Sequence, residues 1–168
     1  RVSAMAAAYG MSPADVSFMP SPVTHITGAI WAFDMPWIAG NSCVLVDVWS
    51  PEEGIALIEQ HHCTVSGGAT PFLQQMLDVA ESRPERLASL RRLGYGAAPM
   101  PAALLDRVRS LLPDVGLVQG YGMTECAVLT ILEPEEHERF HLLRSVGRPV
   151  PGVVVSIRDL DGNPVPVG

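Results

Sequence analysis

The chain has 168 residues, a length typical of one domain. Hydrophobic residues make up 48% and charged residues 17%, so the chain can bury a sizeable core, which excludes an intrinsically disordered protein. The net charge is −7 and all 11 basic residues are arginine, a balance that argues against a nucleic-acid partner.

Short β-rich runs alternate with helical patterns along the first part of the chain. The sequence predicts strands at 16–19, 43–48, 64–66, 90–95 and 115–118, and helices at 26–39, 50–61, 70–80 and 101–112. Strands joined by helices of this length form right-handed crossovers within a mostly parallel sheet. We therefore predict an α/β fold, in which residues 26–39 form a buried helix.

The pattern changes near residue 146. Residues 147–152 are typical of a turn-rich linker, residues 153–157 of a strand, and Asp161-Gly162 of a hairpin turn. We expect an α/β portion over 1–145, and over 146–168 a linker with the first strands of a truncated, β-barrel-like subdomain.

The sequence contains no lysine, and this restricts its chemistry. A Walker-type phosphate loop ends in Gly-Lys-Ser/Thr, and Schiff-base catalysis needs a lysine amine, so these residues can build neither. The chain also begins at Arg1 rather than at methionine. We expect it to be a piece of a longer protein, which would supply any lysine that the chemistry requires.

The cysteines at 43, 63 and 126 are widely separated, and none belongs to a CxxC pair. This spacing fits neither a disulfide framework nor a zinc ligand set, so we expect reduced, mostly buried thiols in a cytoplasmic protein. Asp34 and Pro36 interrupt the most apolar run, and no transmembrane segment is expected.

Three glycine-containing loops, 67–69, 94–99 and 120–125, follow predicted strands. Ligands of open parallel sheets bind at the carboxyl ends of the strands, and glycine lets a backbone approach a flat or anionic ligand closely. The Rossmann fingerprint is excluded, because Glu125 stands where that pattern requires glycine or alanine.

Within the third loop, Thr124 and Glu125 form the most suggestive pair. A hydroxyl can donate to a phosphate oxygen and a carboxylate can bind a hard divalent cation, so the pair suits a nucleotide with Mg²⁺. A helix start with Thr124 as its N-cap explains the same two residues equally well. The residues alone leave both interpretations open.

The segment from Gln119 to Glu125, QGYGMTE, resembles the YGxTE motif of the adenylate-forming superfamily, and most closely that of its acyl-CoA synthetases. Three other segments resemble motifs of this family in the same order along the chain. They are 20–28, whose histidine would begin the acyl-pocket helix, 94–99, similar to the adenine-binding loop, and 145–152, similar to the SVGRPxPG stretch.

This resemblance implies a two-step reaction. A carboxylic acid attacks the α-phosphate of ATP to give an acyl-adenylate and pyrophosphate, and a thiol, usually that of coenzyme A, then displaces AMP to form a thioester. The apolar residues around Met123 favour an acyl or alicyclic acid.

The resemblance also implies roles for individual residues. Thr124 would contact the α-phosphate, and Glu125 would bind Mg²⁺. Tyr121 would pack on the adenine ring and Gln119 would reach its amino edge, beside the backbone of Gly96, Ala97, Ala98 and Gly120. The carboxylate pocket would be lined by His25, Gly67, Gly68, Gly122 and Met123.

The family's phosphate-loop lysine, ribose-binding aspartate and C-terminal catalytic lysine have no counterpart in this sequence. We therefore expect the complete protein to be a ligase, and this piece alone to be inactive and at most a weak adenylate binder. Two alternatives stay open, a non-catalytic adenylate-binding module and an adenylation domain that loads a carrier-protein thiol.

The remaining candidates have simpler structural explanations. His137 and His141 have metal-like spacing but no third ligand, so we expect a solvated helix rather than a zinc site. Trp31, Phe33 and Trp37 are expected to belong to the core.

Overall fold

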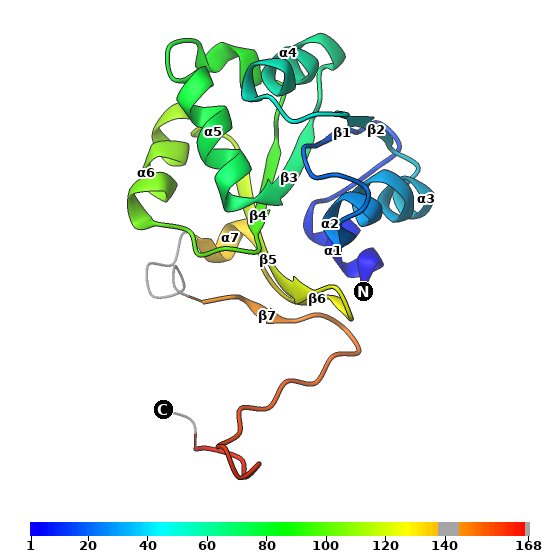
Figure 1. The fold of residues 1–168 in the computed structure, drawn as a ribbon, viewed down its shortest axis with the longest axis vertical. Helices are drawn as coiled ribbons and strands as arrows, with labels where there is room; N and C mark the ends of the chain where they lie inside the picture. The colour runs from blue at the N-terminus through cyan, green and yellow to red at the C-terminus, as the bar shows by residue number, and fades with distance from the viewer. Residues whose placement is uncertain (138–144, 167–168) are drawn as a thin grey trace.

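The computed structural model describes residues 1–137 and 145–166, and these build one mixed sheet of order β2-β1-β3-β4-β5-β6-β7 (Figure 1). The strands are β1 (Val16–Met19), β2 (Ser42–Leu45), β3 (Val65–Ala69), β4 (Arg92–Gly96), β5 (Gly116–Met123), β6 (Ala127–Leu132) and β7 (Arg148–Pro149). Neighbours from β2 to β5 are parallel, whereas β6 and β7 pair antiparallel. The predicted α/β fold is confirmed.

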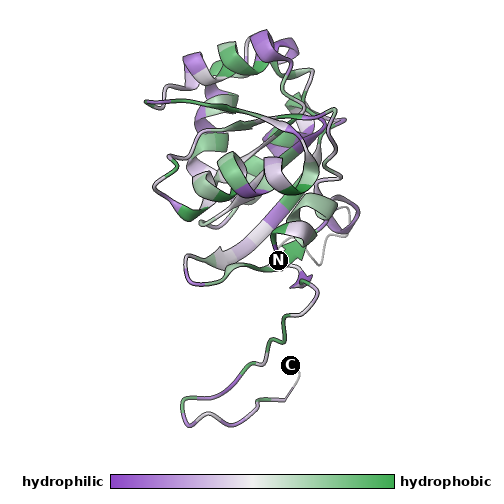
Figure 2. Cartoon of the chain, turned by 90° about the vertical axis from the view of Figure 1, so that its right-hand side faces the viewer, coloured by the Kyte–Doolittle hydropathy of each residue, from purple (hydrophilic) through white to green (hydrophobic). Residues whose placement is uncertain are grey.

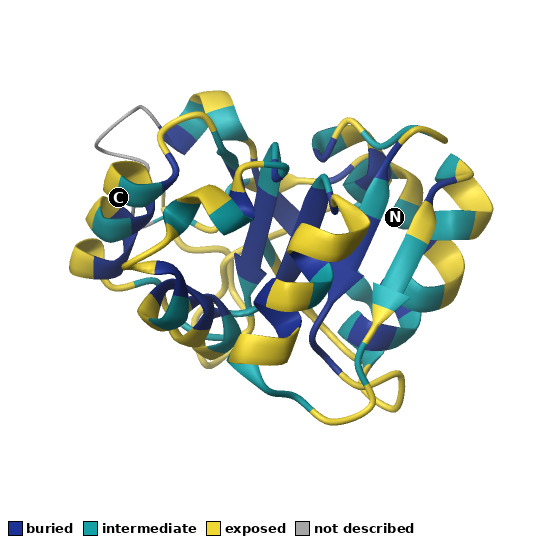
Figure 3. Ribbon diagram, turned by 90° about the horizontal axis from the view of Figure 1, so that it is seen from above, coloured by how far each residue is buried: buried dark blue, intermediate teal, exposed yellow. Residues whose placement is uncertain are grey.

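Helices cover both faces of this sheet. They are α1 (Val2–Ala8), α2 (Ile26–Ala29), η1 (Ile30–Asp34), α3 (Met35–Ala39), α4 (Pro51–His61), α5 (Thr70–Ala80), η2 (Pro84–Leu87), α6 (Ala102–Leu111) and α7 (Pro134–His137). Successive strand residues point to opposite faces, so Phe18 belongs to the core cluster that includes residues of α4, α5 and α6, while Met19 belongs to the cluster that includes residues of α1 and η1. Figure 3 shows the resulting buried strands between helices with exposed outer surfaces.

Residues 26–39 form a helical stretch with a π-helical turn, η1, in its middle. The prediction of a wholly buried helix is wrong. Trp31 is 1% exposed, but Phe33 is 62% and Trp37 is 90% exposed. Only one side of the stretch contacts the sheet, so an apolar sequence was not sufficient to bury the other side.

The largest local departure from the predicted elements is the hairpin of β5 and β6. Strand β5 extends to Met123, beyond the predicted end at 118, and a turn at 124–126 leads directly into β6. The alternative in which Thr124 caps a helix is therefore wrong. The aliphatic and β-branched run of β6 pairs with β5 instead of forming a helix, which is the pairing such residues favour.

The segment after β7 extends away from the sheet (Figures 1 and 2). Residues 153–157 form no strand, and Val154 is 95% exposed, because no neighbouring strand lies beside them among the described residues. A turn with Gly162 at φ +85° brings Arg158 opposite Pro164, as the hairpin prediction requires. The boundary near residue 146 stays a prediction.

In the described part of the chain, no helix is long and apolar enough to cross a membrane. Its cysteines are all free. Cys63 is buried, and burial raises the pKa of its thiol to about 11, whereas Cys43 and Cys126 are half-buried.

Candidate adenylate site

The carboxyl ends of three parallel strands meet in register. Ala69 of β3 lies opposite Gly96 of β4, and Gly96 lies opposite Gly120 of β5. The three glycine-containing loops singled out by the sequence are therefore neighbours at one edge of the sheet, as predicted.

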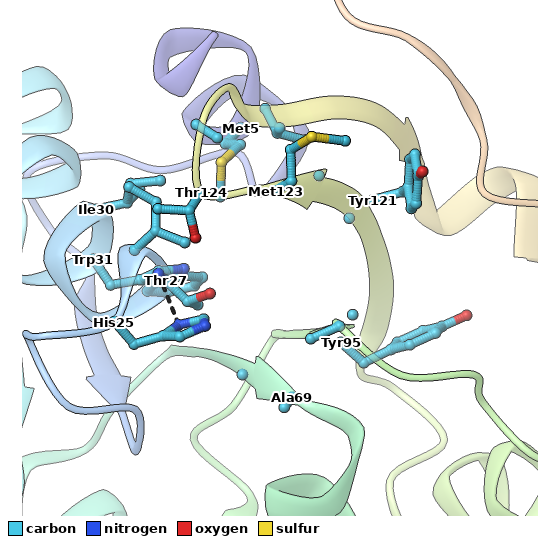
Figure 4. A pocket seen from close by; sticks show the side chains of 18 of the residues that line it. Met5, His25, Thr27, Ile30, Trp31, Ala69, Tyr95, Tyr121, Met123 and Thr124 are labelled. Carbon is cyan, nitrogen blue, oxygen red and sulfur yellow. Dashed lines mark hydrogen bonds between the residues drawn. The ribbon is translucent and has the colours of Figure 1, made fainter.

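A cavity of about 270 Å³ opens at this edge (Figure 4). His25, Thr27 and Trp31 form one wall, and Met123 and Thr124 reach toward it from the β5–β6 hairpin. The other lining residues are mostly apolar or contribute only their backbone. They are Met5, Tyr9, Ile26, Ile30, Gly68, Ala69, Tyr95, Gly96, Ala97, Gly120, Tyr121, Gly122, Ala127 and Val128.

A second cavity, of about 500 Å³, adjoins the first. Residues 96–97 and 120–122 line both cavities, and Gln119 with residues 98–100 and 145–146 lines only the second. A Cβ atom built on Gly120 would meet no other atom within 4 Å, so the backbone is open to a ligand at this point.

The loop after β4 has an unusual backbone. Ala97 has φ +60°, a left-handed conformation that costs a non-glycine residue about 1 kcal/mol. The Ala98 N–H donates to the Gly96 carbonyl over 2.7 Å, and the Thr70 hydroxyl donates to the Ala98 carbonyl over 3.0 Å. Thr70, at the start of α5, thus holds a strained loop in place, as is common at ligand sites.

The hairpin turn places Thr124 and Glu125 differently. The Cys126 N–H donates to the Met123 carbonyl over 3.2 Å and closes the turn, while Arg1 Nη1 donates to the Cys126 carbonyl over 2.8 Å. Thr124 lines the first cavity, whereas Glu125 is exposed and lines neither cavity.

His25 precedes α2, and its Nδ1 accepts the N–H of Thr27 over 3.2 Å (Figure 4). Because Nδ1 is the acceptor, the neutral ring carries its proton on Nε2. His25 is exposed at the mouth of the cavity, and its Nε2–H is available to donate to a ligand oxygen. His25 is therefore not buried in the core.

The two glycines of β3 also differ. Gly68 lines the first cavity, but Gly67 does not, because the indole of Trp31 covers it. Gly67 therefore supports the cavity wall from behind instead of forming it.

Tyr95 and His137 form a buried polar pair that the sequence did not reveal. Tyr95 Oη lies 3.0 Å from His137 Nε2 and 3.2 Å from Gln119 Oε1. Burial is the main cause that lowers the pKa of His137. The prediction of a solvated His137 is wrong, because α7 packs its last residue against β4 and β5, and His141 lies outside the described residues. Among the described residues, no cluster of three His, Cys, Asp or Glu could hold a metal.

Comparison with known proteins identifies the family. The family model described as AMP-binding enzyme matches residues 1–168. The chain belongs to this family. Within it, the medium-chain fatty-acid–CoA ligase of Escherichia coli K12 is 30% identical over 155 residues, covering 92% of this chain. The predicted resemblance to adenylate-forming enzymes is confirmed, and acyl-CoA ligases are among the relatives.

Two solved structures show the same fold. The amide bond synthetase McbA from Marinactinospora thermotolerans is 33% identical, with a TM-score of 0.85 over 99% of this chain. O-succinylbenzoate coenzyme A synthetase from Bacillus subtilis, solved in complex with ATP and a magnesium ion, is 27% identical, with a TM-score of 0.83 over 98% of this chain. The chain spans only 27–33% of the length of these three relatives.

Proposed function

We propose that the complete protein activates an apolar carboxylic acid with ATP and transfers the acyl group to coenzyme A. The carboxylate oxygen attacks the α-phosphorus of ATP, which releases pyrophosphate and leaves an acyl-adenylate. The thiolate of coenzyme A then attacks the acyl carbon and displaces AMP. The main support for this proposal is that Ala69, Gly96 and Gly120 lie opposite one another on adjacent strands and line one cavity together with Thr124, in a chain that belongs to the AMP-binding enzymes.

The second cavity is the proposed site of the adenine ring. Its backbone wall at Gly96, Ala97 and Ala98 has no side chain larger than a methyl group, so a flat ring can approach it. Tyr121 lines this cavity and is 46% exposed, which leaves its ring available for stacking. Gln119 and Gly120 complete the proposed adenine site.

The first cavity is the proposed site of the acid and the α-phosphate. Thr124 would donate its hydroxyl proton to an α-phosphate oxygen, and His25 Nε2–H would donate to the carboxylate. Gly68, Gly122 and Met123 complete this wall, and the buried Trp31 at its back favours an apolar acyl group over a polar one.

Glu125 suits a magnesium ion that reaches the site together with the nucleotide. Magnesium is commonly held by one or two carboxylates, water and substrate phosphates, so a single exposed carboxylate next to Thr124 is a sufficient protein ligand. When bound, the ion would neutralise charge on the phosphates. A tight site made by the protein alone is not expected, since the described residues contain no larger ligand cluster.

The test is carboxylate-dependent exchange of pyrophosphate into ATP, measured on the complete protein with short, medium-chain, alicyclic and aromatic acids. We expect exchange with one class of apolar acid, and a fall of about 10²-fold in the Glu125→Gln and Thr124→Val variants. Glu135→Gln is the matched control, because Glu135 is exposed on α7 and lines neither cavity. A folded protein that binds AMP but exchanges with no acid would instead be a non-catalytic adenylate-binding module.

The acyl acceptor has a second candidate. The similarity to an amide bond synthetase favours an amine as the acceptor, whereas the similarity to fatty-acid–CoA ligase favours coenzyme A. Exchange measures only the first step and is common to both. Product analysis with coenzyme A, a simple amine or a phosphopantetheine carrier protein as the acceptor distinguishes these possibilities.

We also propose that residues 1–168 alone do not turn over. They contain no lysine to balance the triphosphate charge, and they span about a third or less of the three relatives described above. Product formation by the isolated chain would contradict this proposal.

A further inference from the structure

The hydroxyl of Tyr95 lies between two side chains, and either of them could accept a hydrogen bond from it. Tyr95 and His137 are only 4% and 3% exposed, so water does not easily replace either contact. Oη is 3.0 Å from His137 Nε2 and 3.2 Å from the terminal amide of Gln119. Burial raises the pKa of Tyr95 to about 12, and the hydroxyl therefore keeps its single proton.

The position of the histidine proton determines where this hydroxyl proton goes. His137 Nδ1 lies 2.8 Å from the backbone carbonyl of Glu133. A carbonyl oxygen can only accept, so Nδ1 must carry a proton. In the neutral ring Nε2 is then an acceptor, and it receives the proton of the Tyr95 hydroxyl.

The direction of the Tyr95 hydrogen bond also determines the orientation of the Gln119 amide. Once the Tyr95 hydroxyl donates to His137, its oxygen can form a hydrogen bond with Gln119 only by accepting one. The NH₂ group of Gln119 must then face Tyr95, since the amide oxygen and nitrogen are assigned from the surrounding hydrogen bonds. The Gln119 carbonyl is left to meet a ligand in the second cavity, which this residue lines.

We propose that Tyr95 and His137 are positioning residues that turn the Gln119 carbonyl toward the ligand and so select a 6-amino purine over a 6-oxo purine. This inference rests on the proposed function, because it requires a purine in the second cavity. An adenine amino group donates to the carbonyl, whereas the oxygen of a 6-oxo purine would face it as a second acceptor.

Protonation of His137 reverses the direction of the hydrogen bonds that join His137, Tyr95 and Gln119. Among the described residues, the charged groups facing this histidine are Arg109 of α6, which donates to its backbone carbonyl over 2.7 Å, and Glu136 of α7. Burial and the Arg109 charge lower the pKa of His137, and the Glu133 hydrogen bond and Glu136 oppose them without reversing the shift. The ring is therefore neutral near pH 7. In acid, Nε2–H donates to Tyr95, Tyr95 donates to the Gln119 carbonyl, and the amide NH₂ turns toward the cavity.

The experiment compares the affinities of AMP and inosine monophosphate for the complete protein by calorimetry. These nucleotides share the same phosphate and ribose, so changes in phosphate ionisation cancel in their ratio. We expect the wild-type protein to prefer AMP by about tenfold or more, since leaving a buried acceptor unpaired weakens binding by about that factor. The Tyr95→Phe variant should lower the ratio to about threefold or less, and His137→Leu should reverse the preference.

His61→Leu is the matched control, because His61 is exposed at the end of α4 and lines neither cavity. If His137→Leu does not fold, the wild-type ratio measured from about pH 7.5 to about pH 5.5 replaces it and should fall in acid. AMP binding with a ratio that neither substitution nor acid alters would overturn this inference alone. A folded wild-type protein that binds neither nucleotide would overturn the proposed function together with it.

Discussion

The indole of Trp31 lies directly against Gly67. A Cβ atom on Gly67 would lie 2.6 Å from Trp31 Cζ2, closer than two such carbon atoms can approach. Trp31 cannot move aside easily, because it is 1% exposed and meets the ring of Tyr9 edge to face, with 5.1 Å between ring centroids. The back wall of the first cavity therefore depends on a glycine in β3.

Gly67→Ala is expected to lower the free energy of unfolding by about 1–3 kcal/mol, because the added methyl group forces Trp31 or β3 to shift. Urea unfolding followed by tryptophan fluorescence measures the loss. An unchanged midpoint would mean that Trp31 has room to move and that the contact does not constrain the wall.

Gly120→Ala is expected to leave the stability of the fold almost unchanged and to weaken ligand binding instead. A Cβ atom at Gly120 meets nothing within 4 Å, so the free energy of unfolding should change by less than about 0.5 kcal/mol. The methyl group would enter space that both cavities share, and AMP affinity should fall by about tenfold. Calorimetric titration with AMP, alongside the urea unfolding curve, separates the two effects.

Thr70→Val should release the loop after β4, since the valine cannot donate to the Ala98 carbonyl. We expect about 1 kcal/mol of lost stability and a several-fold weaker AMP affinity, because the strained conformation of Ala97 is no longer held. Thr70→Ser keeps the hydroxyl and should bind AMP as the wild-type protein does. Equal affinities in the two variants would show that the hydroxyl does not position the loop.

Asp15 joins the N-terminal segment to the sheet. Its carboxylate accepts from Arg91 Nε and Nη2 over 2.9 and 2.7 Å, from the Thr64 hydroxyl over 2.7 Å, and from Ser12. Burial by itself would raise the pKa of Asp15, but the hydrogen bonds from Arg91, Thr64 and Ser12 outweigh it and hold this pKa well below its usual range.

A carboxylate whose pKa is lower in the folded protein than in the unfolded chain stabilises the fold at any pH above its unfolded pKa of about 4. This stabilisation is lost as the pH falls toward the folded-state pKa. Asp15→Asn should therefore cost about 2–3 kcal/mol at neutral pH, and progressively less below about pH 4. Urea unfolding across this pH range measures the difference. Asp78→Asn, in the surface pair with Arg107, is the control and should change stability by less than about 1 kcal/mol at any pH. If the loss of unfolding free energy in Asp15→Asn did not change with pH, the lowered pKa of Asp15 would be contradicted.

The sequence was sufficient for features that depend on local chemistry. Ser50 and Pro51 mark the start of α4, and the structure shows the Ser50 hydroxyl accepting the N–H of Glu53 over 3.4 Å. The glycine-rich runs ending β3, β4 and β5 could be placed at one sheet edge, because parallel strands joined by helices bring their carboxyl ends together.

Other features depend on partners distant in sequence. The run at 127–132 is a strand because β5 offers a free edge, and Phe33 is exposed although most residues of the stretch 26–39 are apolar. His137 is 42 positions from Tyr95, so no local pattern could indicate that the two rings share a hydrogen bond.

The sequence by itself therefore determined the α/β class, the family motifs and the loops that meet at the site, because turn chemistry and hydrophobic periodicity act over a few residues. Only the tertiary structure decided which of these residues line a cavity. Gly67 lies behind Trp31, Glu125 is exposed at the hairpin turn, and Tyr95 contacts His137, because strand pairing and packing bring together residues that are far apart along the chain.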